Sequence, residues 1–219
     1  MNKNLYVLAL GVFGITTTEF GVIGVLPEIA SAFHIPIEKA GWLLSTFALI
    51  VAVFGPFMLM ILSSFKRKNL LLLSLFIFVA ANILSACITN FYLLLIVRMI
   101  PAFFHPVYWS IALSVAGQAS NIKDKSRAVS IIFSGLTLAT VMGVPLATFM
   151  SDFFSWQSSF LLSALINVVA LAGVWIYLSE IQRVSQLKYF TTNNYGLGSS
   201  SRFSLLLLCI LLMDIWLTI

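Results

Sequence analysis

The sequence predicts an all-α protein that crosses a membrane several times. Of its 219 residues, 61% are hydrophobic and only 9% are charged, whereas soluble domains carry roughly 25% charged residues. The mean hydropathy is +1.07. The apolar residues also occur in runs of about 17 to 24 residues separated by short polar breaks, which is the length of helix that spans a bilayer. A water-soluble globular protein is therefore excluded.

Six of the apolar runs are long enough, at about 1.5 Å per residue, to cross a hydrocarbon core of about 30 Å. The first run exceeds the roughly 7 to 15 apolar residues of a signal-peptide core and precedes no small-x-small cleavage site, so we expect it to remain in the membrane. The six predicted spans are Leu5–Leu26, Ala40–Leu62, Leu70–Ile88, Leu93–Ala116, Ala128–Met150 and Trp156–Leu178.

The last part of the chain has a different composition. Residues 179–202 are polar and rich in Asn, Gly and Ser, which predicts a flexible linker. The final run, Phe203–Ile219, is apolar but short and contains Asp214, so it predicts only a partial seventh helix. We therefore expect a six-helix bundle over residues 1–178, a cytoplasmic linker over 179–202 and a partial helix over 203–219.

The basic residues between the spans predict the orientation. If the N-terminus is cytoplasmic, ten Lys and Arg lie on the inner side and Lys39 alone lies on the outer side, which satisfies the positive-inside rule. Arg67 and Lys68 belong to the inner loop between the second and third spans. Since the net charge of +5 is explained in this way, nucleic acid is not an expected partner. The ten are Lys3, Lys66, Arg67, Lys68, Lys123, Lys125, Arg127, Arg183, Lys188 and Arg202.

Two charged residues lie within the spans. A carboxylate as deep as Glu19 costs about 2.5 kcal/mol or more, so it should face protein or a water-filled cavity, where it could carry a proton. Glu19 and Arg98 lie about 10 Å and about 8 Å from the outer ends of their helices, so they could form an ion pair if the helices are neighbours. A simpler interpretation remains open for each residue. Glu19 could be a structural carboxyl bonded to nearby hydroxyls, and Arg98 could extend to the outer headgroups.

Arg98 shares a helix face with two further polar residues. At about 100° per residue, Arg98, His105 and Trp109 form one stripe along the fourth span. A cation, an imidazole and an indole on one face would suit the wall of a cavity for an aromatic or polar organic solute. The alternative is that His105 and Trp109 only pack against neighbouring helices.

Small residues recur at every fourth position of the fifth span. Gly135, Ala139, Gly143 and Ala147 form a smooth ridge that lets another helix approach closely. Pro145 adds a local break. From physical chemistry alone, this ridge predicts a tight helix contact rather than a contact with a solute.

Three segments together resemble the major facilitator superfamily and, within it, the bacterial drug:proton antiporter branch with its sugar-efflux and purine-efflux permeases. They are TTTEFGVIGVLPEIASA (16–32), RMIPAFFH (98–105) and GLTLATVMGVPLATF (135–149), the last followed by Trp156. The resemblance covers roughly residues 5 to 178. It implies a fold of two six-helix bundles that rock about a central site, and proton-driven export of a small organic solute across a bacterial inner membrane.

The same resemblance assigns roles to individual residues. It associates Glu19 and Arg98 with proton coupling and the cavity, and it matches Gly135, Gly143 and Pro145 to the antiporter motif of the fifth helix. The family signature of the loop between helices 2 and 3 would align with residues 59–68. Here Ser63 replaces its aspartate and only Arg67 and Lys68 match at the end, so a locking interaction through that aspartate is not expected.

The chain stops where the second bundle of this fold should begin. We therefore expect it to be the N-terminal half of a permease, shortened by a frameshift or an early stop near residues 180–205. A homodimer, or assembly with a separate C-terminal half, is the variant of this hypothesis. Alternating access needs two bundles, so one half should not complete a transport cycle by itself.

Two other classes of function compete with transport. A membrane enzyme would need clustered His, Asp, Glu or Cys near one interface, but the two histidines are separated and no metal-ligand spacing occurs. Cys87 and Cys209 are interpreted as small hydrophobic residues. No enzymatic activity, cofactor or metal is therefore expected. A membrane subunit that does not itself transport remains the alternative, and lipid, protons and a small organic solute are the expected partners.

Overall fold

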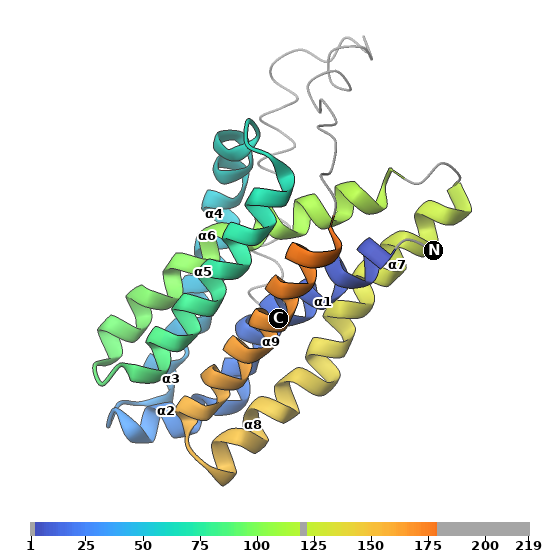
Figure 1. The fold of residues 1–219 in the computed structure, drawn as a ribbon. Helices are drawn as coiled ribbons and strands as arrows, with labels where there is room; N and C mark the ends of the chain where they lie inside the picture. Colours follow the sequence, from blue (N-terminus) through green and yellow to red (C-terminus); the bar gives the residue numbers. More distant parts are fainter. Residues whose placement is uncertain (1–2, 119–121, 179–219) are drawn as a thin grey trace. The chain divides into compact units, whose positions relative to one another are not determined.

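The computed structural model describes residues 3–118 and 122–178, and Figure 1 shows that these residues form a bundle of helices. Within this part of the chain no strand occurs, which confirms the all-α prediction. The elements are α1 (Lys3–Phe20), the 3₁₀ turn η1 (Gly21–Val25), α2 (Leu26–Ala32), α3 (Ile37–Ala40), α4 (Trp42–Leu62), α5 (Arg67–Cys87), α6 (Phe91–Ala116), α7 (Ile122–Leu138), the π-helical turn η2 (Ala139–Gly143), α8 (Val144–Phe153) and α9 (Trp156–Tyr177).

These elements combine into six segments that are long and apolar enough to cross a membrane, as predicted. Five of them are longer than the sequence indicated, the first and the fifth by the most. The first continues through α2 to Ala32, and the fifth begins at Lys123 rather than Ala128, because a helix can extend its charged first turn beyond the hydrocarbon into water. The linker predicted over 179–202 and the helix predicted over 203–219 lie outside the described residues. The six spans are Asn4–Ala32, Ile37–Leu62, Arg67–Cys87, Phe91–Ala116, Lys123–Phe153 and Trp156–Tyr177.

The first span forms the centre of this bundle. α1 packs against α6, α7 and α9, while α4 pairs with α6, and α5 pairs with α6 and α9. The first span is accordingly the most buried of the six and the second the least. Leu8, Val12 and Ile15 of α1 meet Phe78 of α5 and Ile132 of α7 in one hydrophobic core. Polar groups on α1 therefore face protein from several sides.

Two prolines account for the two irregular turns. Proline lacks a backbone N–H, and its ring clashes with the carbonyl four residues earlier. For Pro27 that carbonyl belongs to Ile23, in the middle of η1, and for Pro145 it belongs to Val141, in the middle of η2. The break predicted at Pro145 is thus confirmed as a π-helical turn. The two turns lie in spans that pack against each other, since η1 of the first span contacts α8 and η2 of the fifth span contacts α1.

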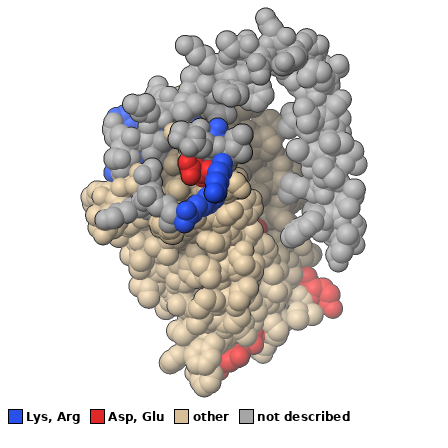
Figure 2. All heavy atoms as spheres, turned by 90° about the vertical axis from the view of Figure 1, so that its right-hand side faces the viewer, with Lys and Arg blue, Asp and Glu red and all other residues tan. Residues whose placement is uncertain are grey.

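Most charged side chains lie at the two ends of the bundle, and Figure 2 shows basic groups gathered at the upper end around an acidic group, with acidic groups at the lower end. At the cationic end, which holds the α4–α5 and α6–α7 connections, Arg67 donates to Ser114 Oγ (2.9 Å) and Lys68 donates to the Trp175 carbonyl (3.1 Å). Both predicted loop cations therefore lie in the first turn of α5 and tie it to α6 and α9. The described acidic residue of this end is Asp124, and its basic residues are Lys66, Arg67, Lys68, Lys123, Lys125 and Arg127.

The anionic end holds the connections α2–α3, α5–α6 and α8–α9. Among the described residues it carries the carboxylates of Glu28, Glu38 and Asp152 and one lysine, Lys39. That lysine is engaged, because its Nζ donates to the Tyr92 hydroxyl (2.8 Å) and lies 4.8 Å from the centre of the same ring. This end of the bundle therefore presents a negative surface.

Candidate functional site

The most unusual contact inside the bundle joins Glu19 of α1 to His105 of α6. The His105 Nε2 atom lies 3.0 Å from the Glu19 Oε2 atom, and the two side chains are 18% (Glu19) and 11% (His105) exposed. The ring N–H is not directed along this line as a hydrogen bond requires. The contact is therefore an ion pair whenever the imidazole is protonated, and both side chains are largely shielded from solvent.

Aromatic rings surround the imidazole of His105. The Phe47 ring of α4 meets it edge-on at 5.7 Å between centroids, and the Phe78 ring of α5 lies at 6.4 Å. Trp109, one helical turn along α6, lies at 6.5 Å and in turn contacts Phe133 of α7 at 5.6 Å. The predicted proximity of His105 and Trp109 is therefore present, and a row of rings connects α4 to α7.

Arg98 faces the interior of the bundle. Its side chain is 4% exposed, its Nη2 donates to the Thr18 carbonyl (2.9 Å), and its guanidinium lies 5.3 Å from the centre of the Phe160 ring. An extension to the outer headgroups is thereby ruled out. The direct ion pair predicted with Glu19 is also wrong, since the carboxylate contacts His105 instead. Arg98 binds the backbone one residue before Glu19, because a helix carbonyl keeps a second lone pair for such a bond.

Thr18 connects three helices through its hydroxyl. The hydroxyl donates to the Gly14 carbonyl (3.1 Å) and accepts from the amide of Asn82 (2.9 Å) on α5 and from that of Asn167 (3.0 Å) on α9. With Arg98 of α6 on its carbonyl, Thr18 joins α1 to α5, α6 and α9. The residue next to Glu19 is therefore held from three sides.

The sequence analysis did not identify Thr18, Asn82 or Asn167. All three are buried, at 3%, 1% and 0% exposure. The signal that could have revealed the two amides is the one that revealed Glu19, namely a polar side chain in the interior of an apolar run, which must find a partner inside the bundle.

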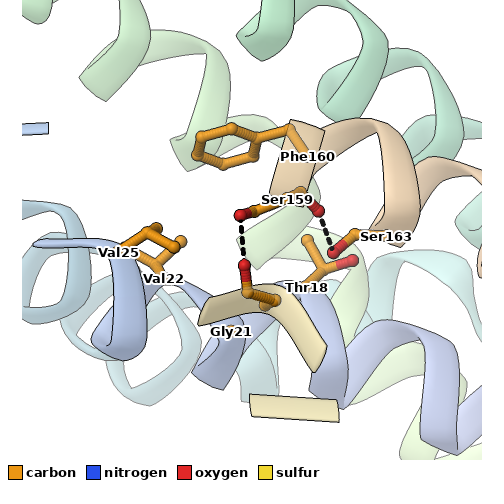
Figure 3. A pocket seen from close by; sticks show the side chains of 8 residues that line it. Thr18, Gly21, Val22, Val25, Ser159, Phe160 and Ser163 are labelled. Atoms are coloured by element: carbon orange, nitrogen blue, oxygen red, sulfur yellow. Dashed lines mark hydrogen bonds between the residues drawn. The ribbon is translucent and has the colours of Figure 1, made fainter. Parts of the chain in front are cut away.

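A small cavity lies beside Thr18, and Figure 3 shows the side chains that line it. Its volume of about 10 Å³ is at the lower limit for one water molecule, so no organic solute fits there. The serine hydroxyls at its wall already have partners, since Ser159 donates to the Ala147 carbonyl (2.6 Å) and Ser163 to the Ser159 carbonyl (3.0 Å). The cavity is therefore a packing gap between α1, η1, α8 and α9.

The small-residue ridge of the fifth span faces α1. A side chain at Gly135 would meet the backbone of Ala9, and one at Gly143 would lie about 2.5 Å from the Thr17 hydroxyl. Ala139 and Ala147 are also buried, with at most 1% exposure. The ridge thus occurs in a close helix contact, as its spacing predicts, and Pro145 begins α8 next to it.

Comparisons with known proteins agree on one family. The model of the Major Facilitator Superfamily matches residues 8–218. The uncharacterized MFS-type transporter YtbD of Bacillus subtilis is 40% identical over 166 residues, which are 76% of this chain and 42% of that protein. The inner membrane transport protein YdhP of Escherichia coli is 35% identical over 180 residues, 82% of this chain and 46% of that protein.

Two further similarities extend this picture. The putative transporter AraJ of Escherichia coli is 33% identical over 182 residues, 83% of this chain and 46% of that protein. The crystal structure of a peptide transporter, POT, in complex with alafosfalin superposes with a TM-score of 0.69 at 14% identity, over 80% of this chain and 38% of that one. The latter likeness concerns the fold alone. The chain spans less than half the length of these relatives.

Proposed function

Since the chain belongs to the major facilitator superfamily, whose matched relatives are named as transporters, we propose that it forms one half of a proton-coupled exporter of small organic solutes. The observation that supports this proposal most directly is the Glu19–His105 contact of 3.0 Å within the membrane-spanning part of the bundle. Ionisable groups at this depth are costly, and they are typical of proton and solute pathways.

The pair can exist in three protonation states. With one proton between them, Glu19 and His105 form either an ion pair or a neutral pair, and the net charge is zero. A second proton leaves a net positive charge, and loss of the first leaves a net negative charge. A change of charge on two packed helices, α1 and α6, alters which arrangement of the bundle is favoured, and this is the coupling that an antiporter needs.

Arg98 has a different role in this proposal. It lies close enough to Glu19 to interact electrostatically, but its hydrogen bond goes to the Thr18 backbone. We therefore assign to Arg98 the positioning of the carboxylate and a fixed positive potential beside it. In the complete transporter, the aromatic row of Phe47, His105 and Trp109 would line the solute path, and it favours solutes with a flat or aromatic part.

A second six-helix half would complete the transporter. The relatives are more than twice as long as the matched region, and alternating access requires one bundle to move against another. That half would come from a continuation of the same chain, a separate chain or a second copy.

Transport into inverted membrane vesicles tests the proposal. Vesicles containing the 219-residue chain and a second half are energised, and release of the proton gradient is recorded by acridine fluorescence after addition of ethidium, arabinose or inosine. We expect a solute-dependent release with the original chain that is absent with Glu19→Gln, because the amide cannot carry the proton. Glu38→Gln, which removes a carboxylate at the anionic end, is the matched control and should behave like the original chain.

Two results would contradict this function. Equal release with the original chain and with Glu19→Gln would remove Glu19 from the coupling mechanism. No release with either would favour the alternative of a membrane subunit without transport activity.

We also propose that the N-terminus is cytoplasmic, because the cationic end then faces the cytoplasm. Cys87 tests this orientation, since it is exposed at the last residue of α5 on the opposite, anionic end. In the Cys209→Ser variant, a membrane-impermeant maleimide added to spheroplasts should label Cys87. Labelling that appears only after the membrane is opened would indicate the opposite orientation. The variant that lacks both cysteines measures the background labelling.

A further inference from the structure

A second site of a different character lies at the anionic end. An open groove of about 440 Å³ runs between α2, the end of α8 and the start of α9, a volume within the roughly 300–1,000 Å³ of ordinary ligand sites. Carboxylate, hydroxyl and indole groups line it, which distinguishes it from an apolar docking surface. The polar and aromatic side chains that line it are Glu28, Ser31, Ser151, Ser155 and Trp156.

Two of these side chains carry polar atoms that the fold leaves without a partner. One carboxylate oxygen of Glu28 is buried and accepts no hydrogen bond, and the same is true of the hydroxyl of Ser151, whose residue is only 6% exposed. Unpaired buried acceptors are costly, by about 1–3 kcal/mol or more for a charged group. An occupant that donates several N–H bonds would remove this cost.

The electrostatics of the groove favour an occupant that carries a positive group and a negative group side by side. Glu28 lines the groove at the anionic end of the bundle, and its carboxylate attracts a cation. Trp156 begins α9 and lines the same groove as Glu28, and the first turn of a helix carries a partial positive charge. A primary ammonium next to a phosphate matches both features, because the ammonium donates three hydrogen bonds and the phosphate accepts from backbone N–H groups.

The position of the groove matches the depth of lipid headgroups. It lies where three spans end or begin, at Ala32, Phe153 and Trp156. A tryptophan at this level is typical of the membrane interface. We propose that this groove binds an ethanolamine-phosphate group, with Glu28 and Ser151 receiving its ammonium. The proposal stands independently of proton coupling, because it involves neither Glu19 nor His105.

Lipid retention tests the proposal. The 219-residue chain is placed in micelles with equal amounts of phosphatidylethanolamine and phosphatidylcholine, and the retained lipids are counted by native mass spectrometry. The two headgroups differ in that the trimethylammonium of phosphatidylcholine donates no N–H bond. We expect at least about a tenfold preference for phosphatidylethanolamine, as loss of a hydrogen bond to a charged group implies.

Variants identify the groove as the source of this preference. Glu28→Gln should abolish it and Ser151→Ala should reduce it several-fold, whereas Glu38→Gln, at the same end but outside the groove, should retain it. Equal retention of the two lipids by the original chain, together with no binding of soluble phosphoethanolamine, overturns the proposal. A preference that survives in both Glu28→Gln and Ser151→Ala also overturns it.

Soluble phosphoethanolamine, titrated by calorimetry against phosphocholine, distinguishes the two sources of this headgroup. Lipid preference without binding of the soluble compound assigns the site to membrane lipid. Lipid preference together with binding of soluble phosphoethanolamine shows that the headgroup alone suffices. Binding of soluble phosphoethanolamine without lipid preference assigns the site to a solute.

Discussion

Replacing Gly135 by alanine is expected to destabilise the bundle by about 3 kcal/mol, in the upper part of the range for overpacking. The added methyl group would collide with the Ala9 carbonyl oxygen and would lie 3.2 Å from the Ala9 carbonyl carbon and the Phe13 nitrogen. All three atoms belong to the backbone of α1, so no side chain can rotate away and α7 must separate from α1. Thermal unfolding of the purified chain in detergent, followed by circular dichroism, measures the loss.

Gly173→Ala is the matched control for this prediction. The added methyl group at this position of α9 has its nearest contact with Val7 at 3.4 Å, which is ordinary van der Waals packing. Within a helix, alanine is favoured over glycine by roughly 0.5–1 kcal/mol. The melting temperature of Gly173→Ala should therefore be unchanged or higher. If the two variants lose equal stability, the close approach of α7 to α1 is not the cause.

Replacing Thr18 by valine should cost about 2 kcal/mol. The change keeps the shape of the side chain but removes three hydrogen bonds, to Gly14, Asn82 and Asn167. Two of these bonds join α1 to other helices, where they are worth roughly 0.6 kcal/mol each on average, and the bond within α1 adds about 0.5–1 kcal/mol. The expected result is a lower melting temperature in the same assay, with reduced contact between α1, α5 and α9.

The neighbouring Thr16 provides the control for this substitution. Its side chain is as buried as that of Thr18, but its hydroxyl has no hydrogen-bond partner. Thr16→Val should therefore be neutral or slightly stabilising, because it removes an unsatisfied buried group. Similar losses in Thr16→Val and Thr18→Val would show that packing, rather than the hydrogen bonds of Thr18, decides the stability.

The six spans could be predicted from the sequence because the length of an apolar run reports directly on the thickness of the membrane. The matching depth of Glu19 and Arg98 followed from the same arithmetic. The partners of these two residues could not be predicted in this way. Helix periodicity shows which face of a helix a side chain lies on, but it does not show which helix packs against that face. His105 lies on the face that Arg98 shares, and only the packing of α1 on α6 decides which of the two meets the carboxylate.

Other features of the site were hidden for different reasons. Asn82 and Asn167 are uncharged, so burying them costs less than burying a carboxylate and does not by itself indicate a functional site, although they hold the residue next to Glu19. The ridge from Gly135 to Ala147 was visible because its four-residue spacing is a local pattern. The groove beside Glu28 was not, because it is assembled from α2, α8 and α9, which are far apart along the chain.

The partners of Thr18 also have a consequence for synthesis on the ribosome. They follow it by 64, 80 and 149 residues, at Asn82, Arg98 and Asn167. At about 5–20 residues per second, the last of them is translated roughly 7 to 30 s after Thr18. The first helix, with its glutamate, must therefore wait at the translocon or in lipid before these interhelical hydrogen bonds can form, and a biogenesis factor that shelters it during this interval would raise the yield of folded protein.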